Sequence, residues 1–176
     1  LAQMLDDLAL PAAILINSDI YAHAPGLAEV FRARGDEFVG HGRSNSERQG
    51  ILSIADETAL IAEATSVLTR EEGVAPKGWL GPWISESENT PDWCMDDQPV
   101  WMRTDHGRLL SVPYPQELND IPMIVARKIE GPAFAQMIID HFDEMLAQST
   151  GEPLIMGIAL HPYIVGQPHR LRHLRR

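Results

Sequence analysis

Two histidines stand directly after apolar segments of this chain, where an imidazole could transfer protons. His41 follows a short apolar segment and is followed by Gly42, whereas His161 follows a longer one and is followed by Pro162. Imidazole changes its charge near neutral pH, which suits acid and base catalysis. In parallel sheets the active groups gather at the carboxyl ends of the strands. We therefore expect both imidazoles to meet at one concave mouth, although each could also be an ordinary surface or core histidine.

Tryptophans and carboxylates gather in the middle of the chain. The segments 78–90 and 93–101 hold all four tryptophans, and Asp96 and Asp97 stand between the last two. Clustered indole rings beside carboxylates are typical of a pocket that stacks planar or sugar-like faces. Asp96 and Asp97 could form a general base or a dyad with one raised pKa. The alternatives are tryptophans that plug the end of the sheet and aspartates in a plain turn.

Other chemical motifs are weaker. His169 and His173 are four residues apart and could share a metal, but the arginines around them would repel a cation. Cys94 is the only cysteine, and a lone cysteine is more often a small apolar residue than a nucleophile. The sequence contains no G-x-S-x-G elbow, P-loop or dinucleotide-binding glycine motif.

Strand-like and helix-like segments alternate along the chain. Short apolar runs predict buried strands, and stripes with steps of three and four predict helices. Pro25 and Pro132 are placed to open helices, Ser53 or Asp56 can cap another, and Gly73 can end it. The expected strands are 12–17, 37–39, 109–112, 121–126 and 154–160. The expected helices are 1–8, 25–34, one that begins after Ser53 or Asp56 and ends at Gly73, 132–150 and a basic one from 168. This alternation predicts an α/β fold with a parallel sheet, either open or closed into a barrel.

The composition is that of one soluble globular domain. The chain has 176 residues, 44% of them hydrophobic, a formal charge of −11 and a pI near 4.9, with a basic C-terminal end. The acidic balance argues against nucleic acid or an anionic membrane as a partner. No apolar run reaches the roughly 18 residues of a membrane span, and no secretion signal is visible. We expect a cytoplasmic protein with a small-molecule or saccharide substrate, and a homo-oligomer is compatible with the sequence.

Five ordered segments resemble the polysaccharide deacetylase family, also called the NodB-homology domain or carbohydrate esterase family 4, and especially its allantoinase-like branch. They are AAILINS, RGDEFVGHGRSNSE, GWLGPWISESENTPD, DWCMDDQP and ALHPYIVGQPHR. The resemblance implies a distorted, incomplete (β/α) barrel over one domain, 1–176, that lacks an N-terminal part and an internal helix-strand segment. It also implies a hydrolase of carbon–nitrogen bonds other than peptide bonds.

The resemblance assigns roles to individual residues. His161 matches the general acid that protonates the leaving amine, and His41 matches the first histidine of a metal-binding pair. Pro82 and Trp83 match an aromatic wall. Together with the clusters above, the expected substrate-binding residues are Trp79, Pro82, Trp83, Trp93, Asp96, Asp97, Pro162 and Arg170.

The chain also departs from the family pattern. Asn45 stands where the second metal-binding histidine is expected, Leu80 replaces an arginine that orients the base, and the aspartate motif would lie before Leu1. Because an amide is a poor zinc ligand, the sequence leaves open whether the protein binds a divalent metal such as zinc. Gln167 replaces an arginine of the allantoinase-like ending, which leaves the substrate open. The alternatives are N-deacetylation of an acylated sugar or hydrolysis of a small amide, metal-independent hydrolysis of a cyclic amide, and a family member that binds without turnover.

Overall fold

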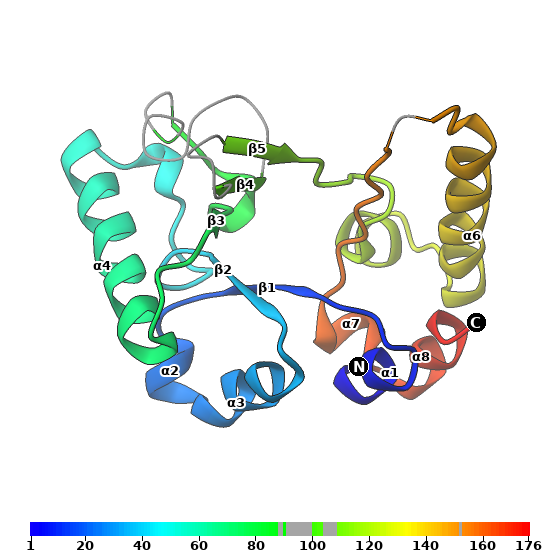
Figure 1. The fold of residues 1–176 in the computed structure, drawn as a ribbon, viewed down its shortest axis with the longest axis horizontal. Helices are drawn as coiled ribbons and strands as arrows, with labels where there is room; N and C mark the ends of the chain where they lie inside the picture. Colours follow the sequence, from blue (N-terminus) through cyan, green and yellow to red (C-terminus); the bar gives the residue numbers. More distant parts are fainter. Residues whose placement is uncertain (88–89, 91–99, 104–108, 152) are drawn as a thin grey trace. The chain divides into compact units, whose positions relative to one another are not determined.

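The computed structural model describes residues 1–87, 90, 100–103, 109–151 and 153–176. The chain divides into two compact units (Figure 1). Ala2 and residues 4–112 form the first in chain order, which we call the sheet unit. Leu1, Gln3 and residues 113–176 form the second, which we call the helical unit. The units are described one at a time.

A five-stranded sheet forms the centre of the sheet unit. Its strands are β1 (Ala13–Ile16), β2 (Glu37–Gly40), β3 (Gly78–Trp79), β4 (Val100–Arg103) and β5 (Leu109–Val112), in that spatial order. β1, β2 and β3 pair in parallel, whereas β3, β4 and β5 pair antiparallel. The expected parallel strands are therefore confirmed at the start of the sheet. Over the residues that the structure describes, the sheet is open and does not close into a barrel.

Helices connect the parallel strands of this unit. α2 (Ile20–His23) and α3 (Pro25–Arg34) lie between β1 and β2, and the 3₁₀ turn η1 (Gln49–Ile51) and α4 (Ile54–Glu72) lie between β2 and β3, whereas α1 (Ala2–Asp7) precedes β1. Ser53 caps α4 by accepting a hydrogen bond from the Asp56 amide, and Gly73 ends it in the left-handed conformation. The sequence predicts the end at Gly73, and Ser53 is one of the two caps that it allows.

One face of α4 contributes three residues to the core of the sheet unit. Leu60, Ala64 and Leu68 recur every four residues, so they lie on one side of the helix, and all three are buried. Leu60 and Ala64 pack with Trp79 of β3, whereas Leu68 packs with Ile16 and Ala28 from β1 and α3. The sheet is thereby held against α4, and the ends of β1, β2 and β3 are fixed in place.

The helical unit contains four helices around an apolar core. They are the π-helix η3 (Ile121–Ala126), α6 (Gly131–Gln148), α7 (Pro162–Val165) and α8 (Pro168–Leu174). The buried core residues are Met123, Ile124, Phe134, Ile164 and Val165. Pro132, Pro162 and Pro168 stand in the first turns of α6, α7 and α8, and proline costs little there because the first amides have no partner within the helix.

Two expected strands of the helical unit are wrong. Residues 121–126 form the π-helix η3, because Pro122 fits the first turn of a helix and a short apolar run favours strand and helix equally. Residues 154–160 are not a strand in the described part of the chain. A strand needs a partner for its backbone, and this segment makes one parallel bridge, Asn119 to Ala159, while Leu154 and Ile155 are exposed.

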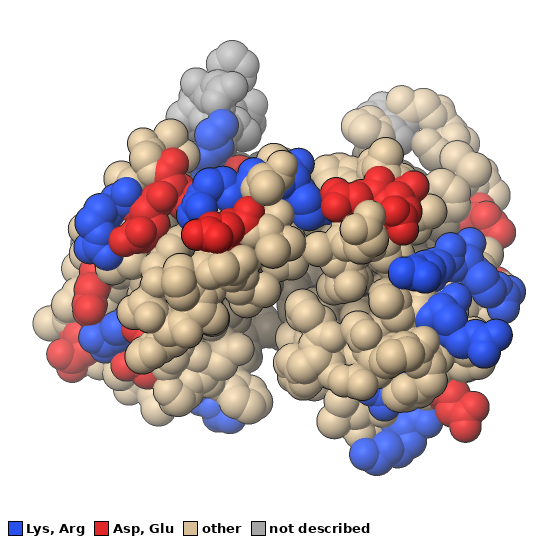
Figure 2. All heavy atoms as spheres, turned by 90° about the horizontal axis from the view of Figure 1, so that it is seen from below, with Lys and Arg blue, Asp and Glu red and all other residues tan. Residues whose placement is uncertain are grey.

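Charges on the surface are mixed. On the face drawn in Figure 2, acidic and basic side chains lie beside one another, and no continuous basic surface covers that face. No helix in the described part of the chain combines the length and the apolar character needed to cross a lipid bilayer.

Candidate active site

The carboxyl ends of β1, β2 and β3 bring three loops of the sheet unit together. Asn17 follows β1, and its side-chain amide donates a hydrogen bond to the backbone oxygen of His41 after β2. The His41 Nδ1 lies 2.6 Å from the backbone oxygen of Leu80 after β3, so Nδ1 carries the proton and donates it. The amides of Ser18 and Asp19 donate to the oxygens of Gly42 and Arg43. His41 is therefore held at the edge where catalytic groups of parallel sheets gather.

Trp83 presents an exposed indole ring at the same edge. It lies in the 3₁₀ turn η2 (Pro82–Ile84) and is 65% exposed, while Pro82 is buried against Gly42. Its Nε1 donates to the backbone oxygen of Asn45 at 2.6 Å, and the guanidinium of Arg48 lies 4.9 Å from its ring centroid. Trp83 and Ile84 have φ values of 65° and 54°. Such a conformation is costly for residues with side chains and is found preferentially at functional sites.

A buried polar network lies beneath this loop. Glu57, Gln49 and Thr90 are each at most 1% exposed. Glu57 accepts hydrogen bonds from the hydroxyls of Ser87 and Thr90 and one of 3.4 Å from the Gln49 amide. Gln49 in turn accepts from Trp79 Nε1 at 3.1 Å. The network ties the segment after β3 to α4, because leaving any of these buried groups without a partner would be costly.

In the helical unit, Asp120 holds His161 with both carboxylate oxygens. Oδ1 lies 2.6 Å from His161 Nδ1, and Oδ2 accepts the His161 backbone amide at 2.7 Å. The Asp120 side chain is fully buried, whereas that of His161 is 27% exposed. A carboxylate oxygen accepts hydrogen bonds, so Nδ1 carries a proton and donates it to Oδ1, which leaves Nε2 outside this contact. This is the arrangement of an imidazole whose orientation is fixed for proton transfer.

Neighbouring polar groups complete the surroundings of this pair. Burial raises the pKa of the Tyr114 phenol, and the negative charge of Asp120 raises it further, against the effect of a hydrogen bond with Asn119. Tyr114 is therefore a neutral phenol at neutral pH. Asn119 is buried, and its side chain accepts the Ile121 amide at 3.1 Å, which fixes the backbone beside Asp120.

Comparison of this chain with solved structures identifies its fold. PuuE allantoinase superposes with a TM-score of 0.82 at 24% identity, over 99% of this chain and 62% of its own. A structure named as a probable polysaccharide deacetylase from Pseudomonas aeruginosa PAO1 gives the same values. The chain has the polysaccharide deacetylase fold.

A third structure agrees with this assignment. A protein from Mycobacterium smegmatis that carries the same family name superposes with a TM-score of 0.75 at 20% identity, over 99% of this chain and 66% of its own. No protein-family model and no curated protein sequence matches the chain. The chain thus spans about three-fifths of the length of the first two structures that share its fold. The resemblance inferred from the ordered sequence segments is confirmed at the level of the fold.

The polysaccharide deacetylase fold raises the question of a metal ion at His41. Among the residues described, no three His, Cys, Asp or Glu side chains lie close enough together to hold one. The Asn45 side chain is an amide, and its backbone oxygen already accepts from Trp83. A zinc site needs at least three strong donors, and the described residues do not provide this set. We therefore derive no step through a metal.

The remaining expected site residues lie in different surroundings. Trp79 is 4% exposed and packs in the core with Leu60, so its position gives no support to substrate binding. Pro162 opens α7 and is exposed, and Arg170 donates to the backbone oxygen of Ile164 at 3.2 Å. Trp93, Asp96 and Asp97 lie outside the described residues. Asp120 was missed by sequence reasoning, because it stands 41 residues from His161 and no local motif joins them.

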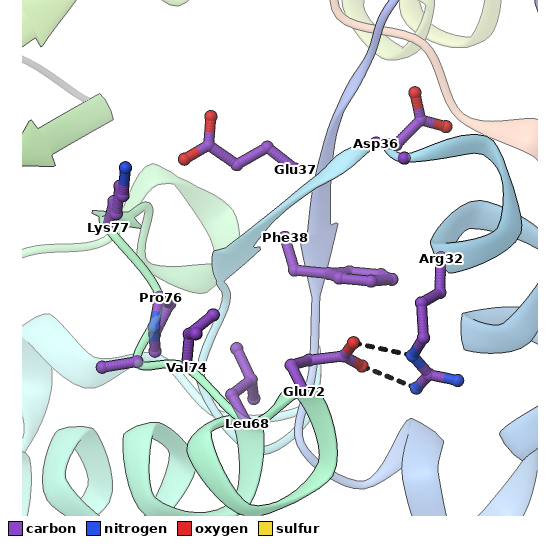
Figure 3. A pocket seen from close by; sticks show the side chains of 11 residues that line it. Arg32, Asp36, Glu37, Phe38, Leu68, Glu72, Val74, Pro76 and Lys77 are labelled. Atoms are coloured by element: carbon purple, nitrogen blue, oxygen red, sulfur yellow. Dashed lines mark hydrogen bonds and ion pairs between the residues drawn. The ribbon is translucent and has the colours of Figure 1, made fainter.

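A cavity of about 230 Å³ lies at the other end of β2 (Figure 3). Figure 3 shows the Phe38 ring above the ion pair of Arg32 with Glu72, and Lys77 at the opposite side. Glu72 also accepts from the Tyr21 hydroxyl at 2.7 Å. The Glu72 carboxylate and the Arg32 guanidinium in the lining are thus already paired with each other. This cavity lies at the amino end of β2, away from the end that carries His41.

Proposed function

We propose that the protein hydrolyses carbon–nitrogen bonds other than peptide bonds, with His161 as the proton donor to the leaving nitrogen. One observation carries the proposal: the buried Asp120 holds the imidazole of a partly exposed His161 through two hydrogen bonds. The polysaccharide deacetylase fold supports it, because the solved structures with this fold are named as deacetylases and an allantoinase.

The reaction places a specific demand on His161. Attack of water on an amide carbonyl gives a tetrahedral intermediate, whose carbon–nitrogen bond breaks readily only when the nitrogen is protonated. Asp120 keeps one nitrogen of the ring engaged and balances the charge of the imidazolium form. Nε2 of that form can then deliver its proton to the departing amine.

His41 is assigned a separate role, within the sheet unit alone. We propose that it orients a water molecule, because the backbone oxygen of Leu80 fixes its ring at the carboxyl end of β2. A main-chain oxygen carries no full charge, so this contact orients the imidazole without favouring its cationic form as a carboxylate does. Such a ring suits a group that accepts a hydrogen bond from water.

Two substrate classes follow from the fold. The first is an N-acetylated amino sugar, as the deacetylase names suggest, and the second is a small cyclic amide, as the allantoinase name suggests. Within the described part of the chain, the donors around His41 do not make up a zinc set, which favours testing the cyclic amide on an equal footing. A binding protein without turnover is the rival proposal, and Asn45 at the expected ligand position motivates it.

His161→Ala tests the function. Oligomers of N-acetylglucosamine and allantoin are the two probes, with release of acetate or opening of the ring as the readout. Loss of a general acid lowers the rate by about a hundredfold to ten-thousandfold, with an unchanged circular dichroism spectrum. His169→Ala, an exposed histidine of α8, is the matched control and should keep the wild-type rate. Wild-type turnover that survives His161→Ala would reject the proposal, and binding of either probe without any turnover would favour the rival.

A further inference from the structure

We propose that Arg48, stacked on Trp83, forms an anion-binding site within the sheet unit, so that the preferred ligand of this site carries a carboxylate. This inference concerns the sheet unit alone and goes beyond the proposed function. Arg48 belongs to the same loop as His41, directly before η1, and Trp83 belongs to the loop after β3. Both loops lie at the carboxyl edge of the parallel strands, within the sheet unit.

Arg48 differs from the other arginines of its unit for which side chains are described. Arg32, Arg34, Arg43 and Arg70 each make an ion pair with a carboxylate. Arg48 is exposed, and in the described part of the chain it makes no ion pair. Its guanidinium contacts the Trp83 ring instead, in a chain with a formal charge of −11. Among the described residues of this acidic chain, Arg48 has no acidic partner, so its guanidinium is available to bind an anionic ligand.

The contact with Trp83 holds the guanidinium without neutralising it. A ring face attracts a cation but accepts none of the in-plane N–H groups of a guanidinium. Those donors form a fork that matches the two oxygens of a carboxylate. Stacking also reduces the freedom that a long side chain would lose when it binds a ligand.

Trp83 is itself fixed as a platform. Its Nε1 donates to the Asn45 oxygen at 2.6 Å, and its neighbour Ser85 accepts the Gly50 amide through its hydroxyl at 3.0 Å. The left-handed backbone at Trp83 and Ile84 turns the indole outward, where it is 65% exposed. A large exposed ring on a strained turn is costly in the folded protein, and a bound ligand would contact both the ring and the charge above it.

The test compares ligands that differ by one carboxylate. N-acetylglucosamine and N-acetylglucosaminuronic acid form one pair, and hydantoin and hydantoin-5-acetic acid form the other. Wild-type protein should favour the acidic member of the pair that it accepts, in KM where it turns over and in calorimetric Kd in either case. Arg48→Gln should weaken the acidic member by about tenfold to a hundredfold and leave the neutral member unchanged. Arg48→Lys should restore part of the loss, because the charge remains and the fork is gone.

Controls separate this proposal from the proposed function. Arg70→Gln removes a positive charge from an exposed site on α4 and should change neither ligand. Equal weakening of both members by Arg48→Gln, or no preference for the acidic member in the wild type, would overturn the anion site even if hydrolysis is observed. If no probe is hydrolysed, the proposed function fails, and calorimetric binding of the acidic member that is lost in Arg48→Gln would still support the anion site.

Discussion

Two buried carboxylates, Asp120 in the helical unit and Glu57 in the sheet unit, have opposite surroundings. Asp120 contacts His161, which is partly exposed and carries a group able to transfer protons. Glu57 contacts the side chains of Ser87, Thr90 and Gln49, and the last two of these are buried. The two carboxylates are equally buried but have different partners, so we expect their removal to affect different properties of the protein.

The comparison separates effects on rate from effects on stability. Removing a carboxylate that orients an exposed imidazole disturbs a reacting group but leaves few buried donors unpaired. Removing one that accepts several buried donors leaves each of them without a partner. The following variants test this difference, beginning with the largest expected effect.

Asp120→Asn should lower the hydrolysis rate by about a hundredfold or more while the fold persists. The amide oxygen can still accept the His161 backbone N–H, but the amide group can offer an N–H to Nδ1 and favour the wrong tautomer. Steady-state kinetics and urea unfolding on the same preparation measure both quantities. A large loss of stability with an unchanged kcat would reverse the role that we assign to Asp120.

Glu57→Ala should lower the free energy of unfolding by about 3 kcal/mol or more, because the Ser87 and Thr90 hydroxyls and the Gln49 amide lose their acceptor. We expect kcat of the folded protein to change much less than in Asp120→Asn. The exposed Glu63 of the same helix is the matched control, and Glu63→Ala should cost no more than about 1 kcal/mol. Equal losses of unfolding free energy in the two variants would show that the buried network adds no more stability than an exposed ion pair.

Ile84→Gly should raise the free energy of unfolding by about 1 kcal/mol. Ile84 has a φ of 54°, a conformation that is strained for a β-branched residue and relaxed for glycine. Ile51→Gly is the control: Ile51 is 80% exposed in η1, and glycine there should lower stability slightly. Chemical unfolding of both variants measures the two changes in stability. Destabilisation by Ile84→Gly would mean that packing of the isoleucine outweighs the strain.

The smallest effect concerns acid stability. The hydrogen bond from Arg32 holds the pKa of Glu72 below its usual value of 4.5, against the effect of burial. A lowered pKa contributes stability above pH 4.5, and this contribution disappears as the pH falls through the folded-state pKa. Glu72→Gln should therefore be less stable than the wild type at pH 7, with a difference that shrinks towards pH 3. Glu117→Gln, at an exposed glutamate of the helical unit, should show no such trend.

The sequence predicted local structure better than it predicted the site. Ser53, Gly73 and the spacing of Leu60, Ala64 and Leu68 were enough to place α4, because caps and periodicity are local signals. Residues 121–126 and 154–160 were predicted wrongly, since an apolar run alone does not say whether a strand partner is present.

The candidate site was predicted in part. His41 lies at the end of β2 as expected, and the ring of His161 is held by Asp120, a partner that is distant in sequence. Trp79 was expected to bind substrate and is buried in the core, because the sequence of a loop does not show which of its tryptophans faces inward. Only tertiary contacts distinguish the buried Trp79 from the exposed Trp83.

The leaving-group dependence of His161→Ala tests the central claim most directly. An N-acetylated amine needs protonation to depart, whereas the nitrophenolate of 4-nitrophenyl acetate departs without it. If His161 is the proton donor, the variant loses about a hundredfold or more on the amide and less than about tenfold on the ester. Equal losses on both substrates would contradict the account, because they would show that His161 maintains the site rather than protonating the leaving nitrogen.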